Sequence, residues 1–328
     1  MNILLLHDAV PATAPPDIQD TLIQAAAVRA ALTELGHTTD VLAVTDDLGA
    51  LVKELRATRA SLIFNLVESL AGSDATAVAV PALLDGLGIR YTGSRAASIA
   101  LSNDKCAAKA YLTRLSLPTP EWVNADSVAP TFRSDHYIVK ARFEHASKDL
   151  EDDAIVHCDT FTAARREVQA RTTALGRPCF AERFIRGREF NLSVLAGPAE
   201  PEVLAPAEID FSAFPAGKAH MVGYRAKWVE DSFEYANTPR RFEFTAADAQ
   251  LLAQLEGLAR ATFQALGLSG YARVDFRVDA EGPWILEVNT NPCISPDGGF
   301  AAALAQSGIR YKDAIVRIIR AAMGDSSS

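Results

Sequence analysis

Charged and amide side chains stand two residues apart on two neighbouring apolar runs near the C-terminus. Arg273 and Asp275 lie on the run ARVDFRV, and Glu287 and Asn289 lie on WILEVN. Residues two apart in a strand point to the same face, so each pair shares one face. Two carboxylates and an amide oxygen form the hard oxygen site that Mg²⁺ prefers, and Mg²⁺ also takes phosphate oxygens. We therefore expect a metal site beside the Arg273 guanidinium, in an enzyme that handles a nucleoside triphosphate.

The segment DAEGP separates the two runs, and its turn-forming residues predict a β-hairpin. Charged residues that alternate with apolar ones are more often the wet face of a sheet. We accept that interpretation for Asp279 and Glu281. It suits Glu287 and Asn289 less well, because EVNTNP leads directly into a Pro- and Gly-rich loop, where functional sites concentrate.

Composition limits the classes of partner. The chain has 328 residues, of which 49% are hydrophobic, enough for roughly two or three domains with a large core. A formal net charge of −9 argues against nucleic acid or an anionic membrane as the main partner, so an anionic ligand needs a local cluster of positive groups. The apolar runs are too short to span a membrane and MNILLLHDAV resembles no signal peptide, which predicts a cytoplasmic protein.

The cysteines follow no pairing pattern and no metal-ligand spacing. Cys106, Cys158 and Cys179 are therefore expected to be reduced cytosolic thiols. Cys293 lies in the loop after the second apolar run, where it is a candidate pocket residue. A nucleophilic role is the weaker interpretation, because no histidine or other base is adjacent in sequence.

Three lysines occupy positions that a solvated surface charge explains poorly. Lys140 ends an apolar strand, Lys105 follows a helix cap, and Lys227 lies between aromatic residues in YRAKWV. Lysine binds phosphate as a compact point charge. By contrast, Lys53 and Lys312 lie on helical faces and fit the ordinary solvated role.

The familiar glycine-rich phosphate loops are missing from the sequence. GxxxxGK[ST] occurs nowhere, and no GxGxxG follows the first strand, which disfavours a dinucleotide site. Backbone amides near Ser147 are the remaining candidates to cradle phosphates.

The segment AERFIRGREF offers groups for a nucleoside. Glu182 is placed to accept a proton from an adenine amino group, the main chain at Phe184 to pair with the ring edge, and Glu189 to bind both ribose hydroxyls. Taken alone, the segment is better interpreted as a hairpin with ordinary surface carboxylates.

Strand and helix patterns divide the chain into three units, at residues 1–100, 101–178 and 179–328. The first alternates strands and helices, which predicts a small parallel sheet with ligand-facing residues just past the strand ends. Helices are expected over 17–35 and 161–175, from the cap at Thr245 to Gly267, and over 311–322. The fold class is α/β.

In chain order, YTGS, NDKCAAK, YIVK, AERFIRGREF, YRAKW, GYARVDFR and LEVNTNP together resemble the ATP-grasp superfamily, most closely the D-alanine–D-alanine ligase group. The resemblance spans nearly the whole chain, and ARVDF and EVNTNP are its most specific parts. It implies a three-domain ATP-grasp fold. An N-terminal parallel α/β domain is followed by two α+β domains that sandwich ATP between antiparallel sheets.

The resemblance also implies roles for particular residues. Lys105 and Lys140 match lysines that contact phosphates, Lys227 matches the lysine near the γ-phosphate, and Arg273 matches the arginine that steadies the reacting carboxyl group. The nucleoside contacts fall on Glu182, Phe184, Ile185 and Glu189. The ligands of two Mg²⁺ ions, with Mn²⁺ as the alternative metal, fall on Asp275, Glu287 and Asn289.

The implied reaction is ligation of a small carboxylic acid or amino acid to an amine through an acyl phosphate, with release of ADP and phosphate. Arg273, Lys227 and Lys140 are the expected catalytic residues. Residues 144–153 and 211–228 are the expected lids that exclude water. Family analogy also suggests a homodimer.

Several segments depart from the pattern of D-alanine–D-alanine ligases. HDAVPATAPPD, NLVESLAGSD, ARFEHASKD and NPCISPDGG stand where the group has its substrate and phosphate loops. We therefore expect a related carboxylate–amine ligase with a rebuilt pocket, lined by Glu68, Cys293, Asp297 and Gly298. D-alanine–D-alanine ligase proper, a small-molecule kinase of the same superfamily and a non-catalytic ATP-binding protein remain the alternatives.

Overall fold

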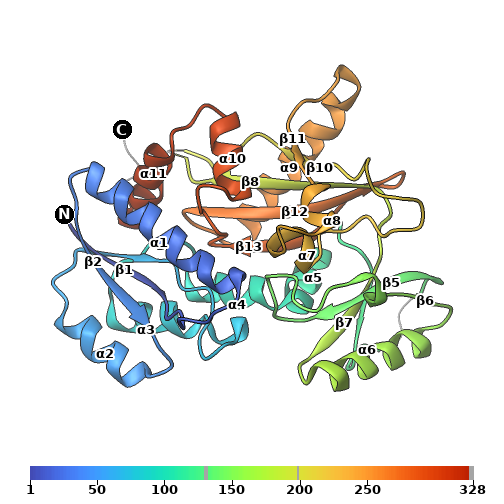
Figure 1. Ribbon diagram of the computed structural model, residues 1–328, viewed down its shortest axis with the longest axis horizontal. Coiled ribbons are helices and arrows are strands. Elements are labelled where there is room, and N and C mark those ends of the chain that lie inside the picture. The colour runs from blue at the N-terminus through green and yellow to red at the C-terminus, as the bar shows by residue number, and fades with distance from the viewer. Residues whose placement is uncertain (129–131, 198, 325–328) are drawn as a thin grey trace.

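Three sheets organise the chain (Figure 1). The computed structural model describes residues 1–128, 132–197 and 199–324. A three-stranded parallel sheet lies in the N-terminal part, a four-stranded antiparallel sheet in the middle, and a six-stranded antiparallel sheet in the C-terminal part. Within these ranges, no helix combines the length and the hydrophobicity that a membrane span requires. The layout is that of the predicted α/β fold.

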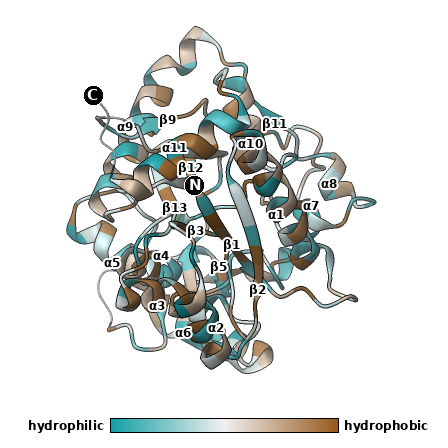
Figure 2. Ribbon diagram, turned by 90° about the vertical axis from the view of Figure 1, so that its left-hand side faces the viewer, coloured by the Kyte–Doolittle hydropathy of each residue, from teal (hydrophilic) through white to brown (hydrophobic). Residues whose placement is uncertain are grey.

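The N-terminal sheet has the strand order β2-β1-β3. Its central strand is the apolar run Ile3–Leu6, buried on both faces as parallel strands are, and Figure 2 shows these hydrophobic residues along β1. The elements are β1 (Asn2–Asp8), α1 (Pro16–Glu34), β2 (Thr38–Val44), α2 (Leu48–Ala57), β3 (Leu62–Asn65), α3 (Ala79–Leu87) and α4 (Ala96–Asn103), with a 3₁₀ turn at Asp74–Thr76.

Helix α1 joins this unit to the C-terminal part. It begins at Pro16, because proline at the first helical position lacks only an N–H that would be unpaired anyway. Val28 and Leu32 on its inner face are fully buried in one core with Ile315 and Ile318 of the last helix. The N-terminal loops are therefore held beside the C-terminal sheet.

The middle sheet has the order β4-β7-β5-β6, and one face of it is covered by α6. Its elements are α5 (Lys105–Arg114), β4 (Trp122–Asn124), β5 (Asp135–Ala141), β6 (Ile155–Cys158), α6 (Phe161–Leu175) and β7 (Cys179–Arg183), with a 3₁₀ turn at Asp152–Ala154. Strand β7 pairs with β4 and β5. Strand pairing thus places Cys179–Arg183 with the second predicted unit, although the predicted boundary after residue 178 assigns it to the third. The boundaries remain a prediction.

The C-terminal sheet has the order β11-β10-β8-β12-β13, with β9 on β8. Helix α9 packs its leucine stripe on the apolar face of β8, β12 and β13. The elements are β8 (Arg188–Leu195), β9 (Glu202–Val203), β10 (Ala207–Ile209), α7 (Tyr224–Trp228), α8 (Phe233–Ala236), β11 (Arg240–Arg241), α9 (Ala249–Ala265), β12 (Tyr271–Asp279), β13 (Gly282–Thr290), α10 (Gly299–Gln306) and α11 (Tyr311–Met323).

The helix predicted from Thr245 to Gly267 is split at its start. Thr245 and Asp248 form a capping box over a 3₁₀ turn, Ala246–Asp248, and α9 follows directly. Gly267 ends the helix with a φ of +62°, as glycine in the left-handed region does. The helix predicted over residues 161–175 matches α6.

Gly187 lets β8 approach β12 closely. A Cβ atom at this position would lie 1.9 Å from the carbonyl oxygen of Val278 on β12. We predict that Gly187→Ala lowers the midpoint of thermal unfolding, because overpacking of this kind destabilises a fold by about 1–3 kcal/mol. The measurement is circular dichroism at 222 nm during heating.

Gly257→Ala is the matched control. Gly257 is exposed inside α9 and a Cβ there would meet nothing within 4 Å, so alanine should raise stability by about 1 kcal/mol. Equal unfolding midpoints for Gly187→Ala and the wild type would contradict the close approach of the two strands.

Candidate active site

A pocket lies between the middle and the C-terminal sheets. Strands β5 and β7 supply one side, β8, β12 and β13 supply the other, and the loop after β5 closes it. Most of the predicted site residues line it: Lys105, Lys140, Ser147, Glu182, Phe184, Ile185, Glu189, Lys227, Arg273, Asp275 and Glu287. The fold therefore brings residues from six of the seven segments that carry the family resemblance into one cavity.

Asp275 is the centre of the predicted metal site. The register of β12 and β13 places Asp275 opposite Glu287, and Arg273 opposite Asn289. Arg273 Nε and Nη2 donate to the two Asp275 carboxylate oxygens at 2.7 and 2.9 Å. Asn289 Nδ2 donates to Asp275 Oδ2 at 3.0 Å, and Asn191 Nδ2 on β8 donates to Oδ1 at 2.9 Å. All four predicted groups are thus on one face of the hairpin.

A β-bulge interrupts the hairpin at this site. The register shifts between Asp275 and Phe276, because Phe276 pairs with Ile285 and Leu286 has no partner. A bulge turns an extra residue out of strict alternation. Leu286 and Glu287 consequently both line the pocket, although they are neighbours in sequence.

Three lysines surround Glu287. Lys105, only 4% exposed, lies 3.3 Å from Glu287 Oε2 and also donates to the Glu144 carbonyl oxygen. Burial opposes ionisation of Glu287, but Lys105, Lys140 and Lys227 outweigh it and hold the pKa of this carboxyl well below its usual range. The pocket therefore contains an ionised carboxylate and a local cluster of cations.

Glu182 is paired with two lysines. Its Oε2 lies 2.6 Å from Lys109 Nζ, and its Oε1 accepts from Lys140. Burial opposes ionisation of Glu182, yet Lys109 and Lys140 lower its pKa overall. The Glu182 residue is 1% exposed, and each of its carboxylate oxygens faces one of these lysines. The predicted adenine contact remains a prediction.

Lys109 is not among the predicted site residues, although NDKCAAK places it one helical turn after Lys105. It is 1% exposed and donates to Thr119 Oγ1 at 2.9 Å, while Thr119 donates to the Ile285 carbonyl oxygen at 2.8 Å. Lys109 therefore connects Glu182 on β7 to β13 through Thr119. The spacing of four residues places Lys105 and Lys109 on the same face of one helix, and this spacing could have indicated that both enter the site.

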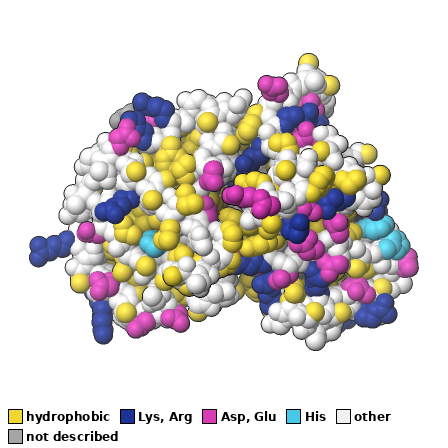
Figure 3. Space-filling view, viewed as in Figure 1, with side chains coloured by type: hydrophobic (Ala, Val, Ile, Leu, Met, Phe, Trp, Pro, Cys, Tyr) yellow, Lys and Arg dark blue, Asp and Glu magenta, His cyan; other side chains and the backbone are white. Residues whose placement is uncertain are grey.

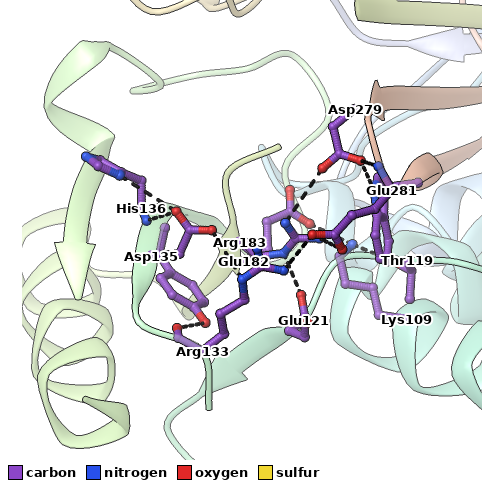
Figure 4. Close-up of polar contacts among 12 residues, drawn as sticks. Lys109, Thr119, Glu121, Arg133, Asp135, His136, Glu182, Arg183, Asp279 and Glu281 are labelled. Carbon is purple, nitrogen blue, oxygen red and sulfur yellow. Dashed lines mark hydrogen bonds and ion pairs between the residues drawn. The ribbon is translucent and has the colours of Figure 1, made fainter. Parts of the chain in front are cut away.

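Arg183 connects the two sheets at the far end of the hairpin (Figure 4). Its guanidinium lies 2.7 Å from Glu121, 3.7 Å from Asp279 and 3.8 Å from Glu281, and 4.8 Å from the Trp284 ring centroid. The solvated-face interpretation of Asp279 and Glu281 was therefore incomplete, because both carboxylates face a buried arginine of the middle sheet.

The loop after β5 reaches the pocket through His145. Its backbone N–H donates to Asp74 Oδ2 at 3.0 Å, and its buried Nε2 has no hydrogen-bond partner in the described part of the chain. Burial, and then the charge of Lys105, lowers the pKa of His145 to about 3. The imidazole is thus neutral at physiological pH.

Asp17 at the start of α1 holds both predicted lid segments. Lys148 of the loop lies 2.9 Å from Asp17 Oδ2, and Tyr224 Oη of α7 donates to Asp17 Oδ1 at 3.0 Å. The Trp228 indole N–H also donates to the Ala146 carbonyl oxygen at 3.3 Å. The two segments are therefore tied to each other and to the N-terminal unit.

The predicted substrate residues lie outside the pocket lining, on the side of the N-terminal unit. Gln24 joins two of their segments, because its Nε2 donates to Glu68 Oε1 at 3.2 Å and its Oε1 accepts from Ile294 N–H at 2.7 Å. Desolvation, and then the negative charge of Asp8, raises the pKa of Glu68 to about 8. Cys293 Sγ lies 2.9 Å from Asp20 Oδ2.

The other two predicted substrate residues belong to the start of α10. Gly298 is its N-cap, and Asp297 is exposed, with Arg240 near enough to feel its charge. The loop after β3 and the loop after β13 thus meet, but they do not share the cavity that holds the lysines.

Neither positive nor negative charge predominates on the face of the molecule shown in Figure 3. Figure 3 shows acidic and basic side chains interspersed over the right-hand part of the molecule, around the middle sheet and α7. The positive groups that an anionic ligand requires are therefore inside the pocket rather than on the surface around it.

Because the pKa of His145 is lowered in the folded chain, folding stability should depend on pH. The unfolded chain takes up a proton at this residue below about pH 6.5, whereas the folded chain does so only near pH 3, so folding stability falls as pH drops between these values. We predict that His145→Gln loses less stability than the wild type between pH 7.5 and 5.5, by about 1 kcal/mol after allowance for its partial exposure.

The measurement is the unfolding midpoint of ligand-free protein at half-unit pH steps. The difference at pH 7.5 serves as the reference, because both side chains are neutral there. Parallel curves for the two proteins would contradict the lowered pKa.

Comparison with known proteins identifies relatives over the whole chain. Residues 161–320 match the family model described as D-ala D-ala ligase C-terminus. A D-alanine–D-alanine ligase of Synechococcus sp. (strain JA-3-3Ab) is 28% identical, over 98% of this chain and 94% of that protein. One from Pelotomaculum thermopropionicum is 30% identical, over 86% of each chain.

Solved structures show the same fold. The crystal structure of the Bacillus anthracis D-alanine–D-alanine ligase complexed with ATP superposes with a TM-score of 0.74 at 19% identity, covering 99% of this chain and 98% of that one. The predicted ATP-grasp fold is confirmed. With a relative 30% identical over most of both chains, the protein belongs to the D-alanine–D-alanine ligase family, as its motifs predicted.

Proposed function

We propose that this protein joins a small carboxylic acid or amino acid to an amine, using ATP and an acyl-phosphate intermediate and releasing ADP and phosphate. Family membership makes it an ATP-using ligase. The observation that carries the detailed proposal is the pocket between the two antiparallel sheets, in which Lys105, Lys140 and Lys227 surround the ionised Glu287 and Arg273 contacts Asp275.

The lysines would neutralise the phosphates. Transfer of the γ-phosphoryl group spreads negative charge over its oxygens, and positive groups fixed in a pocket stabilise that charge without reorganisation. Lys105 and Lys140 are already held close to carboxylates, so an entering triphosphate would exchange one anionic partner for another.

Arg273 would steady the reacting carboxyl group. The substrate carboxylate oxygen attacks the γ-phosphorus, and the bond from that phosphorus to the β-phosphate oxygen breaks, which releases ADP. The amine then attacks the acyl carbonyl, phosphate leaves with its bonding electrons, and the amine loses a proton. The carbonyl oxygen becomes negative in this second step, where a nearby guanidinium is stabilising.

The donor set suits Mg²⁺. Among the described residues, no group of three His, Cys, Asp or Glu side chains could hold a metal ion, and the proposed ligands are two carboxylates and an amide. Asp275 and Glu287 face each other across the hairpin, Asn289 contacts Asp275, and Glu287 is held ionised. We propose these three as ligands of Mg²⁺, which would neutralise phosphate oxygens and orient them.

The identity of the two substrates distinguishes a D-alanine–D-alanine ligase from a related carboxylate–amine ligase. The names of the relatives favour D-alanine for both substrates. The loop after β5 favours another pair, because ARFEHASKD departs from the Gly/Ser-rich loop of D-alanine–D-alanine ligases and places His145 and Lys148 in the pocket lining, with Lys148 paired to Asp17. We place the related ligase first, with the homodimer still a prediction from family analogy.

Product analysis tests the reaction. We predict that incubation with ATP, Mg²⁺ and a pool of amino acids and amines releases ADP and phosphate in equal amounts, with one new amide detected by mass spectrometry. D-alanine alone should give little product compared with the pool. AMP and pyrophosphate would contradict the mechanism, and a stable phosphorylated product without an amine would indicate a kinase.

Glu287→Gln tests the proposed metal ligand. We predict a fall in kcat of about 100-fold or more, because loss of a group that stabilises transition-state charge has effects of this size. Glu281→Gln on the same hairpin is the control, since Glu281 is half exposed and outside the pocket. Similar kcat values for the two variants would remove the metal assignment.

Removal of divalent cations tests the metal independently. We expect EDTA to abolish ADP release and added Mg²⁺ or Mn²⁺ to restore it, whereas Ca²⁺, with its longer bonds and looser geometry, should restore little. Undiminished turnover in EDTA would exclude the proposed role of Asp275, Glu287 and Asn289.

A further inference from the structure

A buried arginine in the nucleotide pocket has no role in the steps described above. Arg277 on β12 is 4% exposed and lines the pocket. The register of β8 and β12 places it directly opposite Glu189, and its Nη2 lies 3.0 Å from Glu189 Oε2. The proposed ribose ligand is therefore half of a cross-strand ion pair.

The guanidinium is fixed from every side. Nη1 donates to the Gly187 carbonyl oxygen at 3.1 Å, and Nη2 donates to the His220 carbonyl oxygen. The rings of Phe184 and Phe211 each lie 5.6 Å from its central carbon. Planar stacking and a fork of donors are what arginine offers and lysine does not. Arg277 therefore holds Glu189 in a defined position.

The ion pair leaves one carboxylate oxygen available. Burial raises the pKa of Glu189, and Arg277 opposes that rise. Arg277 contacts Oε2, whereas Oε1 has no hydrogen-bond or ion-pair partner in the described ranges. An oriented carboxylate with a free oxygen facing a nucleotide pocket is an acceptor for hydroxyl groups.

We infer that Arg277 is a positioning residue that orients Glu189 toward the ribose hydroxyls and so gives the pocket its preference for ribonucleotides over 2′-deoxyribonucleotides. The inference rests on the proposed function, because it takes the pocket to bind ATP. A site that hydrogen-bonds a hydroxyl rejects the analogue that lacks it, since its own polar group is then left unpaired.

Binding of ATP and of 2′-deoxyATP in the presence of Mg²⁺, measured by isothermal titration calorimetry, tests the inference. The wild type should bind ATP roughly tenfold to hundredfold more tightly than 2′-deoxyATP, the range for a hydrogen bond to a charged group. Arg277→Met, which keeps the length of the side chain but loses the fork, should reduce this ratio to about threefold or less.

Arg188→Met is the matched control. Arg188 lies one residue before Glu189 on the same strand and pairs with Glu208 at 2.7 Å, outside the pocket. Its loss should leave the ATP to 2′-deoxyATP ratio at the wild-type value. A general loosening of the sheet would instead change the ratio in both arginine variants.

Two further variants keep the test decisive if Arg277→Met does not fold. Glu189→Gln should show the same loss of discrimination, and Arg277→Lys, which keeps the charge without the fork, should show an intermediate ratio. A wild-type ratio in Arg277→Met or in Arg277→Lys would overturn the inference.

Failure of the inference and failure of the proposed function give different results. If the wild type binds both nucleotides equally, only the inference falls, because ATP binding is intact. If it binds neither, the proposed function falls as well. The measurement needs no turnover, so an unidentified substrate pair does not affect it.

Discussion

The register of β12 between β8 and β13 is the constraint on which the site depends. Asp275 lies opposite Asn191 on one side and Glu287 on the other, so one central strand collects oxygen and amide groups from both neighbours. The opposite face carries Val274 and Phe276, which are fully buried against α9. A slip of one residue would exchange the two faces, so the apolar core fixes where the chemistry lies.

Charge compensation inside the pocket follows from that arrangement. Glu182 is shared by Lys109 and Lys140, and Glu287 lies among three lysines. Buried ion pairs add little net stability, but the loss of one partner is strongly destabilising. Such a pocket favours exchange of partners over exposure of charge. Under the proposed function, a triphosphate that drew Lys140 away would leave Glu182 still paired with the buried Lys109.

Local patterns carried most of what the sequence predicted. Alternation and turn residues gave the β12–β13 hairpin, and helical spacing gave α6 and α9. The three lysines were recognised because each had an unusual neighbourhood in sequence. Arg277 and Lys109 were missed because their partners are distant in sequence. Strand pairing brings Glu189 to Arg277, and helix packing brings Glu182 to Lys109.

The remaining differences have the same origin. The predicted boundary after residue 178 separates β7 from its partners β4 and β5, because that pairing is defined only by tertiary structure. The bulge that turns Leu286 toward the pocket leaves no mark in WILEVN. Glu68 and Cys293 are predicted to line the substrate pocket, which stays a prediction, and the structure brings their loops together around Gln24 and Asp20, outside the cavity that holds the lysines.

Asp17 contacts two segments that come from different parts of the sequence. Lys148 and Tyr224 come from segments that are far apart in sequence, and each is bound to a different oxygen of this one carboxylate. Loss of the Asp17 carboxylate would remove both contacts, while the hydrogen bond from Trp228 to the Ala146 carbonyl oxygen would still join the two segments. Because the two segments share one anchor and also contact each other, they form one connected unit over this side of the molecule rather than two independent loops.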